Sequence, residues 1–494
     1  MNGRKVKDSK SHISIFEAAR LGQIETMEWL VQHGADIHAG GTENNYSDPP
    51  IFEAAEHGQV EAMEWLAQRG VDLNGRENNR GVTPIFRAAY GGQIKAMEWL
   101  AQHGVDIHAR DREDFTPIFD AALGGSAMAV KWLMGHGADV KAMNDNDYPI
   151  YFRAVLSDND EVLDLLAKYG ADIHARDKNG QTPMFAAASH GKIHAMEWLF
   201  KNGADVNARD NRSRTPLFEP VNPAFMFGSV SFHVDALKWL VRHGADVNAK
   251  ADDGETPLFD LAGCRDIAGL KFLIRNGADV NARDNQGRTP VYKTGLYITD
   301  LYEEGEMTAA LKYLVLRGAD IHVEDNNGEN PIFTKARRGC IEGIKWLLQR
   351  KVDANARNKN GETPFFHAAS GGSVGAMKFL AKHGADIHAK DNQGQTPVFR
   401  AVLDCWIAAI EWLAAQGADI HAKDDNGQTP LFHAVLAPKT KTLEWLVEHG
   451  VDIHAKDKHG ATARDVALNK GKMEAAHWLE KQGVATKTMP GLPK

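Results

Sequence analysis

The phrase Trp-Leu-x-x-x-Gly recurs along the whole chain and limits the possible fold more than any other feature. Its first position is filled by Trp29, Trp65, Trp99, Trp132, Trp198, Trp239, Trp346, Trp412, Trp445 and Trp478, and in other copies by Leu165, Phe272, Tyr313 and Phe379. The closing glycines are mostly 33 residues apart, as from Gly137 to Gly170, and Lys351 stands where one would fall. A fixed period of this length indicates stacked copies of one supersecondary unit.

The copy at residues 177–203 shows what one period encodes. Asp, Asn and Gly residues before Thr182 favour a tight turn. We expect Thr182 to cap a first helix and Pro183 to occupy its first position, where no amide donor is needed. Gly191 predicts a left-handed stop, and a second helix then runs to Gly203. Each copy is therefore expected to fold as two short helices.

Helices of this length are marginal in water, so neighbouring copies must stabilise one another. The row of tryptophans is expected to be core. Paired alanines on the first helices let the helices pack closely and leave room for the large rings. The pairs are Ala18-Ala19, Ala54-Ala55, Ala88-Ala89, Ala121-Ala122, Ala187-Ala188 and Ala368-Ala369.

The phrase Gly203-Ala204-Asp205-Val206-Asn207-Ala208, followed by Thr215-Pro216-Leu217, resembles the ankyrin repeat. The resemblance implies an all-α, ankyrin-type α-solenoid of about 14 helix-turn-helix repeats with short β-hairpin-like turns. It covers residues 13–483, leaving an N-terminal extension at residues 1–12 and a flexible tail at residues 484–494. Thr462-Ala463-Arg464-Asp465 replaces the usual Thr-Pro-Leu-Phe, so the last copy is expected to be a C-terminal cap.

This chain departs from the family where ankyrin repeats usually carry His after Thr-Pro-Leu. That slot is filled here by Phe16, Phe52, Phe86, Phe119, Tyr151, Phe185, Phe218, Phe259, Tyr292, Phe333, Phe366, Phe399 and Phe432. An imidazole hydrogen bond is lost and apolar burial is gained.

Composition narrows the possible partners and location. The net charge of -9 argues against a nucleic-acid surface, which would show a basic face. The sequence has no apolar run long enough for a membrane span, and residues 1–12 lack the apolar core of a signal peptide. We therefore expect a cytoplasmic protein, in which Cys264, Cys340 and Cys405 are reduced and packed.

No catalytic, cofactor-binding or metal-binding residues are predicted, so the chain is not expected to be an enzyme. Gly371-Gly372-Ser373-Val374-Gly375 spells a nucleophile elbow but falls on the turn between two helices. Histidines recur before the helix-ending Gly and after Gly-Ala-Asp, and copies in adjacent repeats lie too far apart to share a metal ion. The first set is expected to bond to free carbonyls at helix ends.

The resemblance implies that the turns and first helices form a concave binding face, into which the residue after each Phe points. The candidate residues are Glu17, Glu53, Arg87, Asp120, Arg153, Ala186, Glu219, Asp260, Lys293, Thr334, His367, Arg400 and His433, mostly acidic early and mostly basic late. Two interpretations stay open. The charges form a gradient that selects and orients a partner, or they are an ordinary solvated face.

Two repeats are longer than the others, with inserts near residues 220–232 and 293–306. The first carries Phe225 and Phe227, and the second carries Tyr297 and Tyr302. Such apolar density indicates a docking site with aromatic anchors, or inserts that pack on each other.

The leading hypothesis is a monomeric scaffold or adaptor that binds one or more partner proteins through the concave surface. The alternative is a dedicated inhibitor, or an immunity- or effector-type protein, that occludes one target with the two inserts.

Overall fold

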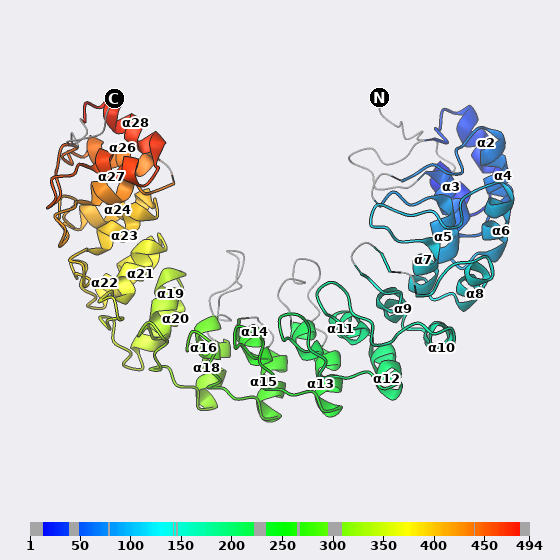
Figure 1. Cartoon of the computed structure of the whole chain (residues 1–494), viewed down its shortest axis with the longest axis horizontal. Coiled ribbons are helices and arrows are strands. Elements are labelled where there is room, and N and C mark those ends of the chain that lie inside the picture. Colours follow the sequence, from blue (N-terminus) through cyan, green and yellow to red (C-terminus); the bar gives the residue numbers. More distant parts are fainter. Residues whose placement is uncertain are drawn as a thin grey trace, which may run out of the picture. The chain divides into compact units, whose positions relative to one another are not determined.

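The computed structural model describes residues 13–38, 49–77, 80–141, 143–144, 147–221, 234–263, 267–294, 309–438 and 440–484. The chain divides into two compact units, Met1–Asp252 and Asp253–Lys494. Along the described residues each unit consists of seven successive helix pairs (Figure 1). The all-α architecture expected from the sequence is confirmed, and the turns contribute only two isolated bridges, Met143 to Pro149 and Lys456 to Thr462, to the part of the chain that is described.

The pairs of the first unit are α1 (Ile15–Arg20) and α2 (Ile24–Gln32), α3 (Pro50–Glu56) and α4 (Val60–Gln68), α5 (Pro84–Tyr90) and α6 (Ile94–Gln102), α7 (Pro117–Leu123) and α8 (Ala127–Gly135), α9 (Tyr151–Ser157) and α10 (Asp160–Lys168), α11 (Pro183–Ser189) and α12 (Ile193–Lys201), and the 3-10 helix η1 (Pro216–Val221) and α13 (Val234–Arg242).

The pairs of the second unit are α14 (Pro257–Gly263) and α15 (Ile267–Arg275), α16 (Pro290–Lys293) and α18 (Ala309–Leu316), α19 (Pro331–Arg337) and α20 (Ile341–Leu348), α21 (Pro364–Ser370) and α22 (Val374–Lys382), α23 (Pro397–Leu403) and α24 (Ile407–Ala415), α25 (Pro430–Ala434) and α26 (Lys441–Glu448), and α27 (Ala463–Asn469) and α28 (Met473–Lys481). Within each unit every first helix contacts the first helix of the next pair.

The pair α11 and α12 begins and ends where the sequence predicts. Pro183 is the first residue of α11, and Gly191 and Gly203 have φ of 64° and 91°. Thr182 occupies the N-cap position, but its hydroxyl makes no capping bond, which corrects one detail of the prediction. The amide of Phe185, which such a hydroxyl could serve, donates instead to the carbonyl of Thr182 at 2.9 Å.

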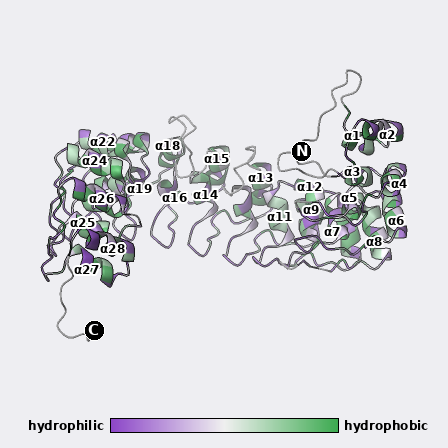
Figure 2. Cartoon of the chain, turned by 90° about the horizontal axis from the view of Figure 1, so that it is seen from above, coloured by the Kyte–Doolittle hydropathy of each residue, from purple (hydrophilic) through white to green (hydrophobic). Residues whose placement is uncertain are grey.

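The core consists of the phenylalanines of the first helices, the small alanines beside them and the leucines that follow the tryptophans. Phe185, Ala187, Ala188 and Leu199 are each at most 1% exposed. Helix ribbons therefore carry both apolar and polar segments (Figure 2). In the fifth pair both Tyr151 and Phe152 are buried. Tyr151 is the residue expected in the phenylalanine slot, but the 33-residue period from Phe119 to Phe185 places Phe152 there, which corrects that expectation.

The expected tryptophan core is only partly observed. Six tryptophans are 7–9% exposed, namely Trp65, Trp99, Trp198, Trp239, Trp346 and Trp445. Trp29 is 36% exposed, and Trp132, Trp412 and Trp478 are half-buried. The indole N–H groups of Trp99 and Trp198 donate to carboxylates of the preceding pair, Glu64 at 3.0 Å and Asp164 at 2.7 Å. Trp99 and Trp198 thus lie at the rim of the core, where the ring is covered and the N–H reaches a polar partner.

Successive turns are joined by main-chain hydrogen bonds between their tips. The amide of Lys359 donates to the carbonyl of Asn327 at 2.8 Å, and the amide of Asn392 donates to that of Asn360 at 2.8 Å. Asp391 shapes its own turn, since its Oδ1 accepts from two amides at 2.9 Å. We call the segments that run from the second helix of one pair to the first helix of the next pair the hairpin loops. They hold the residue just before each first helix at a fixed place beside the next pair.

Both enlarged repeats have altered first helices. In the first, the usual α-helix is replaced by η1, which contains Pro220, and in the second α16 has only four residues. Lys335 of α19 is 1% exposed and its Nζ lies 3.5 Å from the carbonyl of Val291 and 3.4 Å from that of Tyr292, with Thr294 as a third acceptor. The ammonium group therefore caps the shortened α16.

The last pair is closed by polar contacts. Thr462 and Asp465 form a reciprocal capping box at the start of α27. Arg464 donates to the carbonyl of Val484 at 3.0 Å. Val484 is 2% exposed, so this residue, expected to begin the tail, packs on the last pair. Cys340 and Cys405 are free thiols, and Cys264 lies outside the described residues.

Candidate protein-binding face

The candidate binding residues lie on the first helices, one position after the buried phenylalanine slot. We call the surface made by these positions and the hairpin loops the first-helix face. Among the described candidates none is fully exposed: Asp120 and Glu219 are buried, and the others are half-buried. Half-buried charges cannot all stay solvated, so the partners of each side chain decide what the face presents.

Several of these side chains pair with the hairpin loop of the preceding repeat. In five cases the partner is the residue just before the preceding N-cap, 38 positions earlier in the chain. The pairs are Gln181 with Glu219 at 3.4 Å, Glu255 with Lys293 at 2.7 Å, Glu329 with His367 at 3.3 Å, Glu362 with Arg400 at 2.7 Å, and Gln395 with His433 at 3.5 Å. The face is thus internally paired over much of its length.

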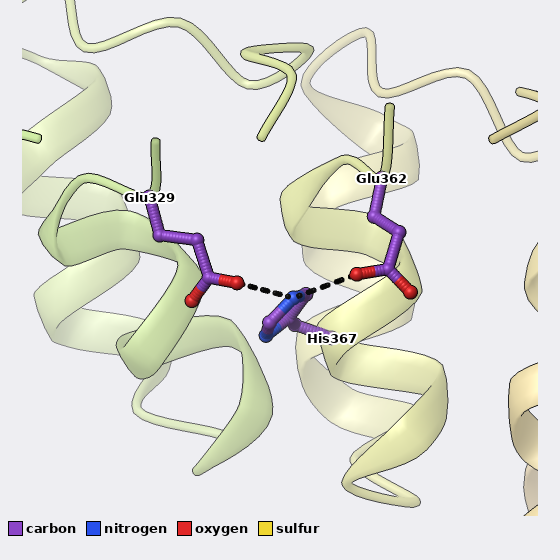
Figure 3. A group of neighbouring side chains, drawn as sticks. All are labelled: Glu329, Glu362 and His367. Carbon is purple, nitrogen blue, oxygen red and sulfur yellow. Dashed lines mark ion pairs between the residues drawn. The ribbon is translucent and has the colours of Figure 1, made fainter. Parts of the chain in front are cut away.

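The densest cluster is formed by Glu329, Glu362 and His367 (Figure 3). His367 Nε2 lies 3.3 Å from a carboxylate oxygen of Glu329 and 3.6 Å from one of Glu362. Burial alone would lower the pKa of His367, but hydrogen bonds to the two carboxylates and their charges raise it to about 9. Burial opposes ionisation of Glu362, yet hydrogen bonds from His367 and Asn358 and the charge of Arg400 lower its pKa to about 2. His367 is therefore an imidazolium at neutral pH.

These three groups also have the composition of a metal site, since their ligand atoms all lie within 4.8 Å of one another. Asn358 decides between the two interpretations. Its Nδ2 donates to the oxygens of Glu329 and Glu362 that face His367, at 3.0 Å each. Its Oδ1 is held by the amides of Asn360 and Glu362, so the amide group cannot turn to offer oxygen to a cation. The cluster fits a protonated histidine better than a metal ion.

In the first four repeats the partners of the candidate side chains do not follow this pattern. Glu17 pairs with Arg20 on the same helix. Arg87 lies 3.0 Å from Glu77, and Asp120 lies 3.1 Å from Arg80, which also pairs with Asp111. Even with this partner, burial raises the pKa of Asp120. The structure gives Glu53 no ion pair among the described residues, and burial together with Glu56 raises its pKa.

Arg153 differs from the other arginines of the face. Its guanidinium carbon lies 4.3 Å above the ring of Phe115, which occupies the position that holds a carboxylate or amide in the five pairs above. An aromatic face attracts a cation but leaves its edge free for other partners.

Models of ankyrin repeats match most of the chain. The model described as ankyrin repeats (3 copies) matches residues 15–111, 51–144, 151–222, 302–391, 335–424 and 398–488, and the model described as ankyrin repeats (many copies) matches residues 233–291. The chain belongs to the ankyrin repeat family. No curated protein matches it in sequence. Ankyrin repeats generally mediate protein–protein interaction, and the family is typically not enzymatic.

The recurring histidines of this ankyrin array have structural partners. Six histidines before the helix-ending glycine have Nδ1 within hydrogen-bonding distance of the carbonyl four residues earlier: His33, His103, His136, His243, His383 and His449. This confirms the prediction that these side chains bond to carbonyls at helix ends. Ser373, in the sequence that spells a nucleophile elbow, is the N-cap residue of α22 in the turn after α21, where the sequence places it.

Several predicted binding residues lie outside the description. Phe225 and Phe227 of the first insert, and Tyr297 and Tyr302 of the second, are outside the described residues. None of the described helices combines the length and apolar character needed to cross a bilayer.

Sequence reasoning missed the pairing between neighbouring ankyrin repeats. The candidate positions form one row along the sequence, and their partners form a second row, just before the N-cap residue of the preceding repeat. Comparing the two rows at an offset of 38 residues shows Glu255 opposite Lys293 and Glu362 opposite Arg400. This signal was present in the sequence.

Proposed function

We propose that this protein is a scaffold or adaptor that binds one or more partner proteins along the first-helix face. One observation supports the proposal most. The residue after the phenylalanine slot changes in charge and size from repeat to repeat, while the framework around it is the same in all but the two enlarged repeats. A varied row of side chains on a repeated framework suits recognition of a protein surface.

The pairing within the face supports recognition rather than opposing it. Side chains such as Arg400, held by Glu362 and Asp391, are already oriented before a partner arrives. Less side-chain freedom is then lost on binding. The charge gradient expected from the sequence stays a prediction, and the residues that carry it are largely neutralised by neighbours.

Affinity capture from the native cell tests the proposal. The full chain is compared with a variant carrying Glu53→Lys and Arg153→Glu, two face residues without an ion pair among the described residues. A control variant carries Glu61→Lys and Lys95→Glu, the same charge changes at exposed positions of α4 and α6. We expect the face variant to lose partners that the control retains, with at least a tenfold weaker affinity at low salt. Equal capture by all three proteins would place the binding site elsewhere.

The alternative, occlusion of one target by the inserts, rests on their apolar composition. Deleting residues 222–233 and 295–308 separates the two functions, because a face-binding protein keeps its partner and an insert-dependent inhibitor loses it. We also propose that the protein acts as a cytoplasmic monomer. Sedimentation of the purified chain tests the oligomeric state.

A further inference from the structure

Arg153 is an exception in the pairing of the first-helix face. Arg87 and Arg400 are each bound to a carboxylate of a neighbouring hairpin loop, at 3.0 Å and 2.7 Å. Among the described residues the side chain of Arg153 forms no hydrogen bond or ion pair, and its cross-repeat neighbour is the ring of Phe115. Its charge is therefore not neutralised by an ion pair within the described fold.

The ring cluster beneath Arg153 is rigidly packed. Phe115 is 3% exposed and meets Phe119 and Tyr148 edge to face, with ring centroids 5.2 Å and 5.6 Å apart. Tyr148 in turn lies 4.7 Å from Phe152. The guanidinium group thus rests on a built aromatic platform, which limits its rotamers.

The nitrogen atoms of Arg153 differ in access. Nε is buried and has no acceptor, whereas the two terminal nitrogens are not among the buried atoms that lack a partner. Since the terminal nitrogens also lack a partner in the described part of the chain, they keep some contact with solvent. A ligand would meet them end-on, away from the ring.

The neighbouring carboxylate does not satisfy this group. Asp120 interacts electrostatically with Arg153, but it is 3% exposed and bound to Arg80 at 3.1 Å. It is already occupied by its own cation. The arrangement leaves an oriented cation without an ion pair in the described residues, whereas Arg87 and Arg400 are paired with carboxylates.

We propose that Arg153 is an anchoring subsite for a carboxylate side chain in an acidic peptide segment of the partner. This inference rests on the proposed function, because it specifies the chemical group of the partner that the first-helix face recognises at the fifth repeat. A planar guanidinium held on a ring suits a carboxylate, which accepts two parallel N–H bonds from it. Lysine at this position would keep the charge but lose both the stacking and the fork.

Selection from a random peptide library displayed on phage tests the subsite. The full chain is the target, beside Arg153→Gln, Arg153→Lys and the control Glu53→Gln, which removes another charge of the same face that has no ion pair among the described residues. Circular dichroism verifies that each variant is folded. We expect peptides selected on the wild-type chain and on Glu53→Gln to carry Asp or Glu at one position.

The decisive measurement is a double-mutant cycle with a selected synthetic peptide. Replacing its acidic residue by the matching amide should weaken binding to the wild-type chain about tenfold, and should change binding to Arg153→Gln less than twofold. Arg153→Lys should bind with intermediate affinity. Selected peptides without an acidic preference, or an equal loss on both proteins, would overturn the subsite and leave the proposed function standing. A library that yields no binder on any form would count against the proposed function itself.

Discussion

Lys351 stands in a backbone conformation that the other repeats reserve for glycine. The residue that follows the second helix has φ of 89° at Gly384 and 66° at Lys351. Left-handed backbone costs an L-residue on the order of 1 kcal/mol, because Cβ approaches the following carbonyl. The sequence alone shows this irregularity, since the lysine interrupts the row of closing glycines.

Replacing Lys351 by glycine should relieve this strain. We expect Lys351→Gly to raise the free energy of unfolding by about 0.5–1 kcal/mol, the strain energy less the greater freedom of glycine in the unfolded chain. Urea unfolding of the full chain measures it. The matched substitution Gly384→Lys should lower stability through backbone strain. No neighbouring atom lies within 4 Å of a Cβ at this position, so a steric clash does not contribute. A loss on Lys351→Gly would show that the side chain contributes more than the strain costs.

His367 gives the face a predictable pH dependence. Its pKa is raised to about 9 by Glu329 and Glu362, above the value of about 6.5 expected in the unfolded chain. A raised pKa means that this stabilisation is complete below pH 6.5 and is lost as pH rises through 9. We expect the stability difference between the wild-type chain and His367→Gln to shrink by on the order of 2 kcal/mol between pH 6.5 and 9.5.

The ring resonance of His367 provides a direct check. Nuclear magnetic resonance of the full chain, with His367→Gln used for assignment, should show titration near pH 9. Titration near 6.5 would mean that the two carboxylates do not stabilise the protonated imidazole ring of His367.

At the scale of single helices, α16 shows how an irregular element is kept in the array. It ends at Lys293, after four residues, so the carbonyls of its last turn cannot all be served by its own helix. Lys335 reaches across from α19 to serve them. Gly343 lies against this side chain, and a Cβ there would lie 2.9 Å from Cys340 Sγ and 3.4 Å from the stem of Lys335. Burial lowers the pKa of Lys335 to about 8.

Restoring the residue common in other repeats should therefore be harmful. Lys335 occupies the place of Ala88 and Ala368, so Lys335→Ala makes the sequence more regular. We nevertheless expect it to lower the free energy of unfolding by about 2–4 kcal/mol, because it leaves a cavity and unserved carbonyls. Arg337→Ala, which removes an exposed cation from the same helix, is the control and should cost less than about 0.5 kcal/mol. Similar effects of the two substitutions would rule out the capping role.

The elements were largely predictable from the sequence, and the partners of individual side chains were not. Pro183 and Gly191 set helix limits through local backbone chemistry, which a sequence shows directly. The role of Lys335 depends on a helix more than forty residues earlier that ends prematurely. The pairing of His367 with Glu329 likewise needs the register between neighbouring repeats, which the repeat period alone does not provide.

At the scale of the whole molecule, stability comes from contacts between neighbouring pairs. First helices contact one another along each unit, and most of the described hairpin loops bond to the next. A pair removed from both neighbours exposes two apolar surfaces and loses its cross-repeat hydrogen bonds. Its own helices are too short to compensate.

Fragments of the second unit test this dependence. We expect a peptide of residues 357–390, which holds α21 and α22 alone, to be unfolded by circular dichroism at 25 °C. A fragment of residues 325–484, which holds five successive pairs and the capping box of α27, should be helical and unfold cooperatively. A stably folded single pair would contradict the proposed dependence on neighbours.

The contacts between each hairpin loop and the first helix of the next repeat mean that the charges of neighbouring repeats must match. If the repeat carrying Arg400 were moved behind one that offers Arg288 in place of Glu362, two cations would meet in a half-buried place. Shuffled or shortened arrays should therefore be tolerated only when the new neighbours carry matching side chains. The side chains at each junction therefore favour one particular following repeat and disfavour others.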